Sequence, residues 1–292
     1  MLVYQDYPDS NHTYFHSEKP DFKLMSVTTA VKTKKISNNE SHWNYWALYK
    51  VLEARIPDFK RIKPMVTPRL TWLEQQAQRF NPTEIEQEIL ALRKLWADNA
   101  EKAANTGTEE HEKKELHAFE SQQIRNPFTG KMVTAQKTSA LEANSEGEIF
   151  KTSLFDNLAD LPDGLLPEQM LSYLFLAGTS DQVFVETINT KRYVDINDFK
   201  FKKKITMGNK YNKFLYPWNN FEESDINTAA FQLSFYAYFL EQAGFIPRHL
   251  AITHHKRMLP VTYLKREIEL FISEFTTASE EKPEYSNEED LI

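Results

Sequence analysis

The segment that most constrains the fold lies between residues 170 and 275, where strand-like and helix-like runs alternate. Residues 170–203 (MLSYLFLAGTSDQVFVETINTKRYVDINDFKFKK) have the alternation and the turn residues of consecutive β-strands. An apolar helix is predicted at 227–245, a further strand at 248–255 and an amphipathic helix at 262–275. This alternation predicts an α/β fold in which a central mixed β-sheet is flanked by helices.

The N-terminal part is predicted to be a hairpin followed by helices. Residues 1–36 alternate apolar and polar positions, with a turn at Lys19-Pro20-Asp21, and lead into a helix. Asn81-Pro82 predicts a helix N-cap with proline in the first turn, and Thr106-Gly107-Thr108 is expected to interrupt that helix. The predicted units are an N-terminal hairpin and helical region (1–80), a core (81–276) with a loop-rich excursion at about 122–165, and an acidic disordered tail (277–292).

Composition excludes several kinds of site. The chain of 292 residues has no cysteine, which excludes disulfides, thiolate zinc sites, iron–sulfur clusters and cysteine nucleophiles. Only 7 glycines are present, so a glycine-rich phosphate loop is not expected. Any metal must therefore be held by oxygen or imidazole ligands. Trp43, Trp46 and Trp96 are expected to pack in a helical core rather than to stack on a ligand.

No run approaches the roughly 18 apolar residues of a membrane span, and the first residues (MLVYQDYPDSNH) lack the features of a signal peptide. A soluble cytoplasmic protein without a membrane partner is expected. The net charge of −7 argues weakly against nucleic acid, but residues 280–292 carry much of it. This acidic tail is expected to solubilise the chain, with docking of a protein partner or imitation of DNA over a basic groove as alternatives.

The stretch 194–204 (VDINDFKFKKK) carries the first chemical signal. Positions i and i+2 of a strand point to the same face, so Asp198 and Lys200 are predicted to share one face. Phe199 then lies on the other face. A surface salt bridge is the simpler explanation of such a pair, which contributes little to stability. Asp195 falls on the face opposite Asp198 in a regular strand and is not expected to be a ligand.

Two further acids precede this pair. Asp181 follows a Gly-Thr-Ser turn that enters a strand, and Glu168 precedes the strand-like run that begins at Met170. If these carboxylates and Asp198 converge at adjacent strand ends, their repulsion is costly without a cation. Oxygen ligands favour hard ions, so Mg²⁺ or Mn²⁺ is expected. Lys200 could orient or help to deprotonate a water and stabilise charge on a phosphoryl oxygen, which suits phosphodiester hydrolysis.

Two helical motifs add to this set. Gln232 and Tyr236 are spaced i,i+4 on an otherwise apolar helix, where a buried amide needs partners. A satisfied core glutamine is the alternative. The segment GTEEHE (107–112) places His111 at the expected start of a helix, as a further metal ligand or phosphate contact. By itself, His111 is more often a surface histidine on a charged helix.

A basic run follows Lys200. It includes Lys202, Lys203, Lys204, Lys210 and Lys213, interleaved with Phe201, Tyr211, Phe214, Tyr216 and Trp218. Lysines neutralise phosphates and aromatic rings stack on bases, so the run favours a track for single-stranded nucleic acid. A solvated strand edge is the alternative.

In chain order, GTEEHE (107–112), Glu168, GTSD (178–181), DFK (198–200) and QLSFY (232–236) resemble the motif series of the PD-(D/E)XK nuclease superfamily. The resemblance is to its RecB-like exonuclease branch, which includes phage exonucleases and the mitochondrial genome-maintenance exonuclease. It covers roughly residues 95–275, and the N-terminal segment HTYFHSEKPDFKLMSVTTAV also resembles the entry segment of phage members. The implied fold is a restriction-endonuclease-like core.

Transferred residue by residue, the resemblance implies that Asp181 and Asp198 ligate the metal and that Lys200 is the catalytic lysine. His111 would be a further metal ligand, and Glu168 would match the acidic residue on the first core helix or on the strand leading from it. Gln232 and Tyr236 would match the motif that positions DNA. The hydroxyls of Ser26 and Thr28 would lie near the DNA path, although an N-cap role explains Ser26 equally well.

The sequence thus predicts an Mg²⁺- or Mn²⁺-dependent deoxyribonuclease, with an exonuclease favoured over an endonuclease. Its partner would be DNA, either single-stranded or as duplex ends. The setting would be phage or mobile-element recombination, replication or repair in a bacterial cell. A catalytically inactive nucleic-acid-binding or recombination-accessory protein on the same fold is the alternative. A third hypothesis is an unrelated α/β protein in which Asp198 and Lys200 form a surface ion pair.

Overall fold

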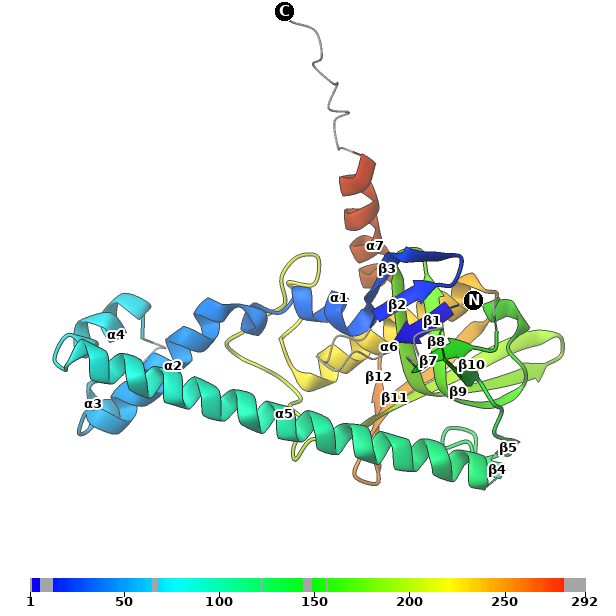
Figure 1. The fold of residues 1–292 in the computed structure, drawn as a ribbon, viewed down its shortest axis with the longest axis horizontal. Helices are drawn as coiled ribbons and strands as arrows, with labels where there is room; N and C mark the ends of the chain where they lie inside the picture. Colours follow the sequence, from blue (N-terminus) through cyan, green and yellow to red (C-terminus); the bar gives the residue numbers. More distant parts are fainter. Residues whose placement is uncertain are drawn as a thin grey trace, which may run out of the picture.

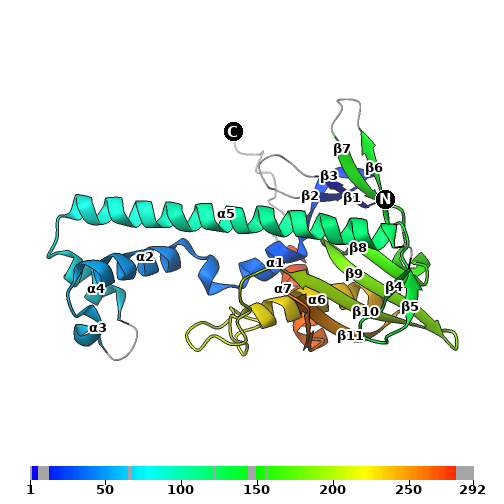
Figure 2. The ribbon, with the colours of Figure 1, turned by 90° about the horizontal axis from the view of Figure 1, so that it is seen from below.

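The computed structural model describes residues 2–5, 13–64, 68–121, 123–143, 149–155 and 157–280. Within this part of the chain, strands form one large mixed sheet and helices flank it, as the sequence predicts (Figure 1). A group of helices lies at the opposite end of the molecule from the sheet. One long helix connects the two ends (Figure 2).

The large sheet has ten strands in the order β12-β11-β10-β9-β3-β2-β1-β7-β6, with β8 paired to β9. Two of its pairs, β10 with β11 and β3 with β9, are parallel, and the others are antiparallel. The strand bounds are β1 Leu2–Gln5, β2 Thr13–His16, β3 Lys19–Ser26, β6 Ser139–Ala143, β7 Ile149–Ser153, β8 Gly164–Tyr173, β9 Leu176–Ile188, β10 Lys191–Lys200, β11 Ile246–His254 and β12 Arg257–Val261.

The main core lies between this sheet and two helices. Parallel strands need a crossover connection, and α6 (Asp225–Gln242) provides it between β10 and β11. Its apolar side chains pack on β9 and β10, which confirms the predicted helix. Trp218 is fully buried, with its ring centroid 3.9 Å from that of Phe231. The last helix, α7 (Lys265–Glu280), closes this core through Phe271.

The N-terminal hairpin is present, but its turn differs from the prediction. The turn between β2 and β3 is formed by Ser17 and Glu18, and Lys19-Pro20-Asp21 is already part of β3. Ser26 then caps α1 (Val27–Thr33) by accepting a hydrogen bond from the Thr29 backbone nitrogen at 3.0 Å. Because β3 pairs with β9, the hairpin is part of the large sheet.

The helices at the far end have a small core of their own, which we call the helical head. It contains α2 (Glu40–Arg55), α3 (Phe59–Ile62), α4 (Leu70–Ala77) and the first turns of α5 (Pro82–Glu120). Leu52 and Leu73 are fully buried in it. The predicted boundary between residues 80 and 81 falls between α4 and α5, inside the head.

Helix α5 contradicts the predicted break at Thr106-Gly107-Thr108, because it continues through these residues to Glu120. Its predicted start is confirmed, since Asn81 caps the helix and Pro82 lies in the first turn. A glycine in a helix costs only about 1 kcal/mol relative to alanine. That cost is smaller than the loss of the hydrogen bonds a break would leave unmade, so the helix continues.

The predicted excursion at 122–165 contains more strand than expected. A separate hairpin is formed by β4 (Gln123–Arg125) and β5 (Met132–Thr134). Strands β6 and β7 then pair with each other and extend the large sheet beyond β1. A short 3₁₀ helix, Leu158–Asp160, leads into β8.

A buried charge network anchors the β4–β5 hairpin to the sheet. Asp195 is completely buried and accepts hydrogen bonds from Arg248 Nε at 2.9 Å and Nη2 at 2.6 Å. His249 Nδ1 lies 2.8 Å from the same carboxylate, and Asn126 at the hairpin donates to it at 3.2 Å. Burial raises the pKa of Asp195, but these donors outweigh it and hold the pKa below its usual value. Asp195 is therefore a structural anchor, in agreement with its exclusion as a ligand.

Among the described residues, no helix has the length and apolar character that crossing a membrane requires. The predicted tail at 277–292 begins inside α7, which ends at Glu280. Residues 281–292 lie outside the described part of the chain.

Candidate active site

Three acids lie at the same level of three adjacent strands. Gln182 of β9 pairs with Asn197 of β10, and the next position in this register places Asp181 opposite Asp198. On the other side of β9, the pairs that flank Glu168 place it opposite Asp181. Strand pairing therefore brings Glu168, Asp181 and Asp198 to one level, as predicted, but Glu168 and Asp181 lie inside β8 and β9 rather than at strand ends. The predicted Gly-Thr-Ser turn before Asp181 is absent, because these residues belong to β9.

Glu168 differs from its expected position because it lies inside β8 rather than before it. Its φ of 48° is in the left-handed region, and it is skipped in an otherwise regular ladder. Leu166 and Leu171, five residues apart, both belong to the main core. Strict alternation would place them on opposite faces, so the pleat of β8 reverses between them, around Glu168. Such strained residues occur most often at functional sites.

Asp181 and Asp198 are both buried, with 9% and 3% exposure. The Phe199 backbone nitrogen donates to Asp181 Oδ2 at 2.5 Å, which ties the two strands together. Burial raises the pKa of Asp181 well above its usual value, and the charges of Asp198 and Glu168 raise it further. Lys200 and the Phe199 N–H oppose this rise. The site therefore favours a bound cation, whether a proton or a metal ion.

Lys200 is the positive charge of this site. Its ammonium forms an ion pair with Asp198 Oδ2, without a well-aligned hydrogen bond, and lies 3.4 Å from Gln232 Oε1. Burial lowers the pKa of Lys200, but the carboxylates of Asp198 and Asp181 outweigh burial and keep its pKa above the usual value. The contact confirms that Asp198 and Lys200 share one face of the strand, as predicted. Phe199 lies on the other face, where its ring stacks on that of Phe201. A protonated Lys200 acts as a hydrogen-bond donor.

Helix α6 supports the acidic strands through Gln232 and Tyr236. Gln232 Nε2 donates to the Tyr236 hydroxyl at 3.4 Å, so the predicted shared face is confirmed. The Tyr236 ring packs on Gly178, where a Cβ atom would lie 2.8 Å from Tyr236 Cε1. Glycine is therefore required in the GTSD segment because the ring occupies the space of a side chain. Burial also raises the pKa of Tyr236 well above its usual value.

Helix α5 passes near Phe199, on the strand face opposite Asp198 and Lys200. The ammonium of Lys114 lies 5.7 Å from the centroid of the Phe199 ring. His111 is located inside this helix rather than at its start, one turn before Lys114 and on the same helix face. The side chain of His111 lies outside the described part of the structure. Its predicted role as a ligand therefore stays a prediction.

A cavity of about 260 Å³ adjoins Lys200 and Gln232. Its lining contains four lysines and a single acid, which are Lys32, Lys35, Lys200, Lys202 and Asp225, and Thr28 also contributes. Burial lowers the pKa of Lys35, with Glu223 opposing the effect. Lys202 is paired with Asp225 and Lys200 with Asp198, so Lys32 and Lys35 supply the positive charge that would favour an anion in this basic cavity.

The predicted DNA-binding residues are only partly brought together. Thr28 and Lys202 line the basic cavity, where Lys202 Nζ lies 2.5 Å from Asp225 Oδ1. Lys203 and Lys204 are exposed to solvent and follow β10. Ser26 serves as the N-cap of α1, which confirms the N-cap role that was the alternative to a position near the DNA path.

The aromatic residues predicted to stack bases divide into two groups. Phe214 and Trp218 are buried at 2% and 0% exposure, so they belong to the core and the prediction for them is wrong. Tyr211 and Tyr216 are exposed at 77% and 65% and remain available.

Lys32 and Lys35 are site residues that the sequence reasoning missed. They occupy α1 and the residues directly after it, about 170 positions from Lys200 in the chain. The basic stretch VKTKK (31–35), next to a segment already singled out at Ser26 and Thr28, was the available signal.

The donor set fits a hard divalent ion in part. Asp181 and Asp198 supply buried carboxylate oxygens in an environment that favours a cation. Among the described residues, however, no three or more His, Cys, Asp or Glu side chains are grouped closely enough to hold a metal ion. Two carboxylates can still hold Mg²⁺, which commonly keeps several waters.

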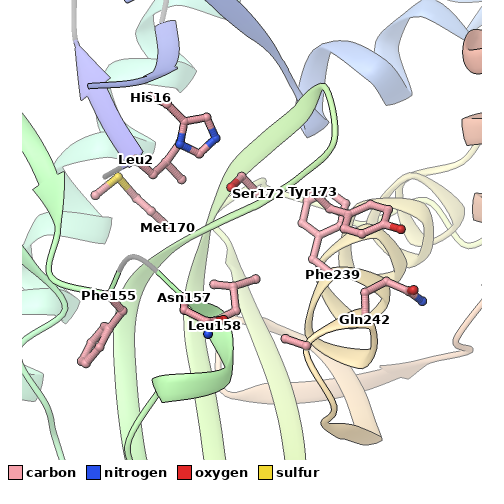
Figure 3. Close-up of a pocket in the computed structure, with 11 residues that line it drawn as sticks. Leu2, His16, Phe155, Asn157, Leu158, Met170, Ser172, Tyr173, Phe239 and Gln242 are labelled. Atoms are coloured by element: carbon pink, nitrogen blue, oxygen red, sulfur yellow. The ribbon is translucent and has the colours of Figure 1, made fainter. Parts of the chain in front are cut away.

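A second cavity, of about 310 Å³, has none of these acids in its lining (Figure 3). Residues from the N-terminal strands, β8 and the C-terminal end of α6 line it, including His16, Met170 and Gln242. Its lining has no acid and no lysine or arginine. It therefore lacks the charged groups that distinguish the basic cavity.

Neither known protein families nor curated proteins give a match to this chain.

Proposed function

We propose that this chain is a metal-dependent nuclease that hydrolyses phosphodiester bonds in DNA. The observation that carries the proposal is the alignment of Glu168, Asp181 and Asp198 on three adjacent strands, with Lys200 directly against Asp198. A surface salt bridge explains this less well, because Asp198 is 3% exposed and a buried acid pair is costly.

Each residue has a role that follows from its position. Asp181 and Asp198 would hold Mg²⁺ or Mn²⁺, which when bound supplies a Lewis acid at the scissile phosphate. Lys200, protonated at neutral pH, would donate hydrogen bonds to the attacking water or to a phosphoryl oxygen that gains charge. Gln232 positions the Lys200 ammonium, and Tyr236 holds Gln232 in place.

The basic cavity supports a polyanionic substrate. Lys32, Lys35 and Lys202 surround a space that opens onto Lys200, and a phosphate group placed there would lie beside the proposed reaction centre. Neutralisation of phosphates by lysine supplies much of the affinity of nucleic-acid-binding proteins. An exonuclease acting on DNA ends or single strands, in phage or mobile-element recombination, replication or repair, remains the favoured form of the proposal.

The test is a cleavage assay with single- and double-stranded DNA labelled at either end, in Mg²⁺, Mn²⁺ or EDTA. We expect Lys200→Ala and Asp198→Asn to lower the rate by at least about 10²-fold, because each removes stabilisation of charge in the transition state. DNA binding in EDTA should largely survive. Lys191→Ala, at the opposite end of the same strand, is the matched control and should cleave normally. Normal cleavage by Lys200→Ala would refute the mechanism.

A second candidate is a nucleic-acid-binding protein without cleavage activity. The observation that favours it is the lack of a group of three metal-ligating side chains in the described part of the chain. The same assay separates the two candidates. Salt-sensitive DNA binding with no product in Mn²⁺ would support the second and contradict the first.

A further inference from the structure

Two of the five tryptophans pack in none of the buried clusters of the described residues. Trp46 and Trp72 pack against the core of the helical head, and Trp218 is in the main core. Trp43 is 44% exposed, and its ring lies 5.8 Å from that of Trp96 with a tilt of 57°. The prediction that Trp43 and Trp96 belong to a helix core is therefore wrong.

This tryptophan pair is held in position by its surroundings. Trp43 comes from α2 and Trp96 from α5, and Arg93 links the two helices by donating to Glu40 at 3.2 Å and Asn44 at 2.7 Å. The ring of His42 lies edge-on to Trp43, with centroids 5.6 Å apart. Trp96 is half-buried, so Trp43 provides the more exposed ring of the pair. An aromatic surface that is already ordered can bind a flat apolar partner at a low cost in conformational entropy.

The pair is close to the basic cavity along the chain. Trp43 is in the first turn of α2, and Lys35 of the cavity is eight residues earlier, a distance of at most about 29 Å. The connecting segment is anchored, because the Ser37 backbone nitrogen donates to Glu223 at 3.1 Å. The aromatic surface and the lysine cluster are thus parts of neighbouring segments of the chain.

We propose that Trp43 and Trp96 form a stacking platform for the unpaired bases of a nucleic-acid strand whose phosphates contact the basic cavity. The proposal rests on the proposed function in taking nucleic acid as the ligand, and it names the substrate class as single-stranded. Unpaired bases present aromatic faces, whereas the bases of a duplex are already stacked on one another. The cavity's four lysines against one acid favour this occupant over an apolar peptide.

The test measures binding without cleavage, in EDTA, by fluorescence anisotropy. The probes are a labelled oligothymidylate, an oligonucleotide of equal length with abasic sites in place of the bases, and a duplex. Stacking of one base corresponds to about a 5- to 150-fold change in affinity. We expect Trp43→Ala and Trp96→Ala to weaken oligothymidylate binding within this range while binding of the abasic strand and the duplex is unchanged. Trp72→Phe, inside the head, is the matched control.

Trp43→Phe keeps an aromatic face and should retain most of the affinity, which guards against loss through misfolding. Equal weakening with the abasic strand, or no weakening at all, would overturn the platform. So would a failure of the unmodified chain to bind the oligothymidylate. Base-dependent binding without any cleavage in Mn²⁺ would support the platform and refute the nuclease, whereas cleavage insensitive to both tryptophans would refute the platform alone.

Discussion

Removal of the Asp195 carboxylate tests whether the buried network anchors the β4–β5 hairpin to the sheet. Asp195→Ala would remove the acceptor of two Arg248 bonds and of the Asn126 amide, leaving these donors without a partner. Breaking a buried charge pair in this way costs about 3–5 kcal/mol. Arg248 retains 22% side-chain exposure and its 2.9 Å bond to Glu186, so we expect about 3 kcal/mol.

The assay is urea denaturation followed by tryptophan fluorescence and circular dichroism, with the free energy of unfolding taken from coincident transitions. Glu84→Gln, which removes an exposed partner of Arg55, is the control and should change the free energy of unfolding little. A double variant, Asp195→Leu with Arg248→Met, should recover part of the loss because no charge is left unpaired. A loss below about 1 kcal/mol for Asp195→Ala would refute the argument that the network is desolvated and essential.

Two further predictions concern stability. Gly178→Ala should destabilise the folded state by about 1–3 kcal/mol, because the new Cβ would lie 2.8 Å from the Tyr236 ring. Gly107→Ala should stabilise it by about 1 kcal/mol, because alanine has the higher helix propensity and no atom lies within 4 Å of the new Cβ. Thermal or urea unfolding of both variants checks the pair, and shifts of the same sign would contradict it. The lowered pKa of Asp195 means that the folded state binds fewer protons than the unfolded state as pH falls below about 5. Stability should therefore be fully present above the unfolded pKa of about 3.9 and be lost as pH falls through the folded pKa. Asp195→Asn should show a smaller dependence in this range, and an unchanged slope would contradict the assignment.

Sequence patterns predict the local structure correctly where one segment contains all the groups that determine it. Asn81 caps α5 because its side chain reaches the Thr83 backbone nitrogen, two residues away. The alternation of β10 likewise requires only its own backbone. The break at Gly107 was predicted wrongly from the same kind of signal, because the neighbouring turns of a 39-residue helix outweigh one unfavourable residue.

Predictions that needed a distant partner failed more often. Nothing near Trp218 in the sequence shows that Phe231 and Phe271 will enclose it, so a ring interleaved with lysines was taken for a base-stacking residue. The prediction for Trp43 was wrong in the opposite sense, since this ring was expected to be buried and is exposed. Burial depends on whether a neighbouring helix covers the ring. Asp195 was excluded as a ligand because it lies three residues before Asp198 and therefore faces the other side of the strand. Its role as an anchor depends on Arg248, 53 positions later in the chain.

The sequence by itself determined that Asp198 and Lys200 share a face, because side chains alternate along any extended backbone. It also determined that Gln232 and Tyr236 share a helix face, which follows from the helical repeat. Only the tertiary structure decided that Glu168 and Asp181 stand at the level of Asp198, and that Lys32 and Lys35 face Lys200 across a cavity. Strand register and the packing of α1 against α6 and β9 are set by pairing and packing between segments far apart in the chain, which no local pattern encodes.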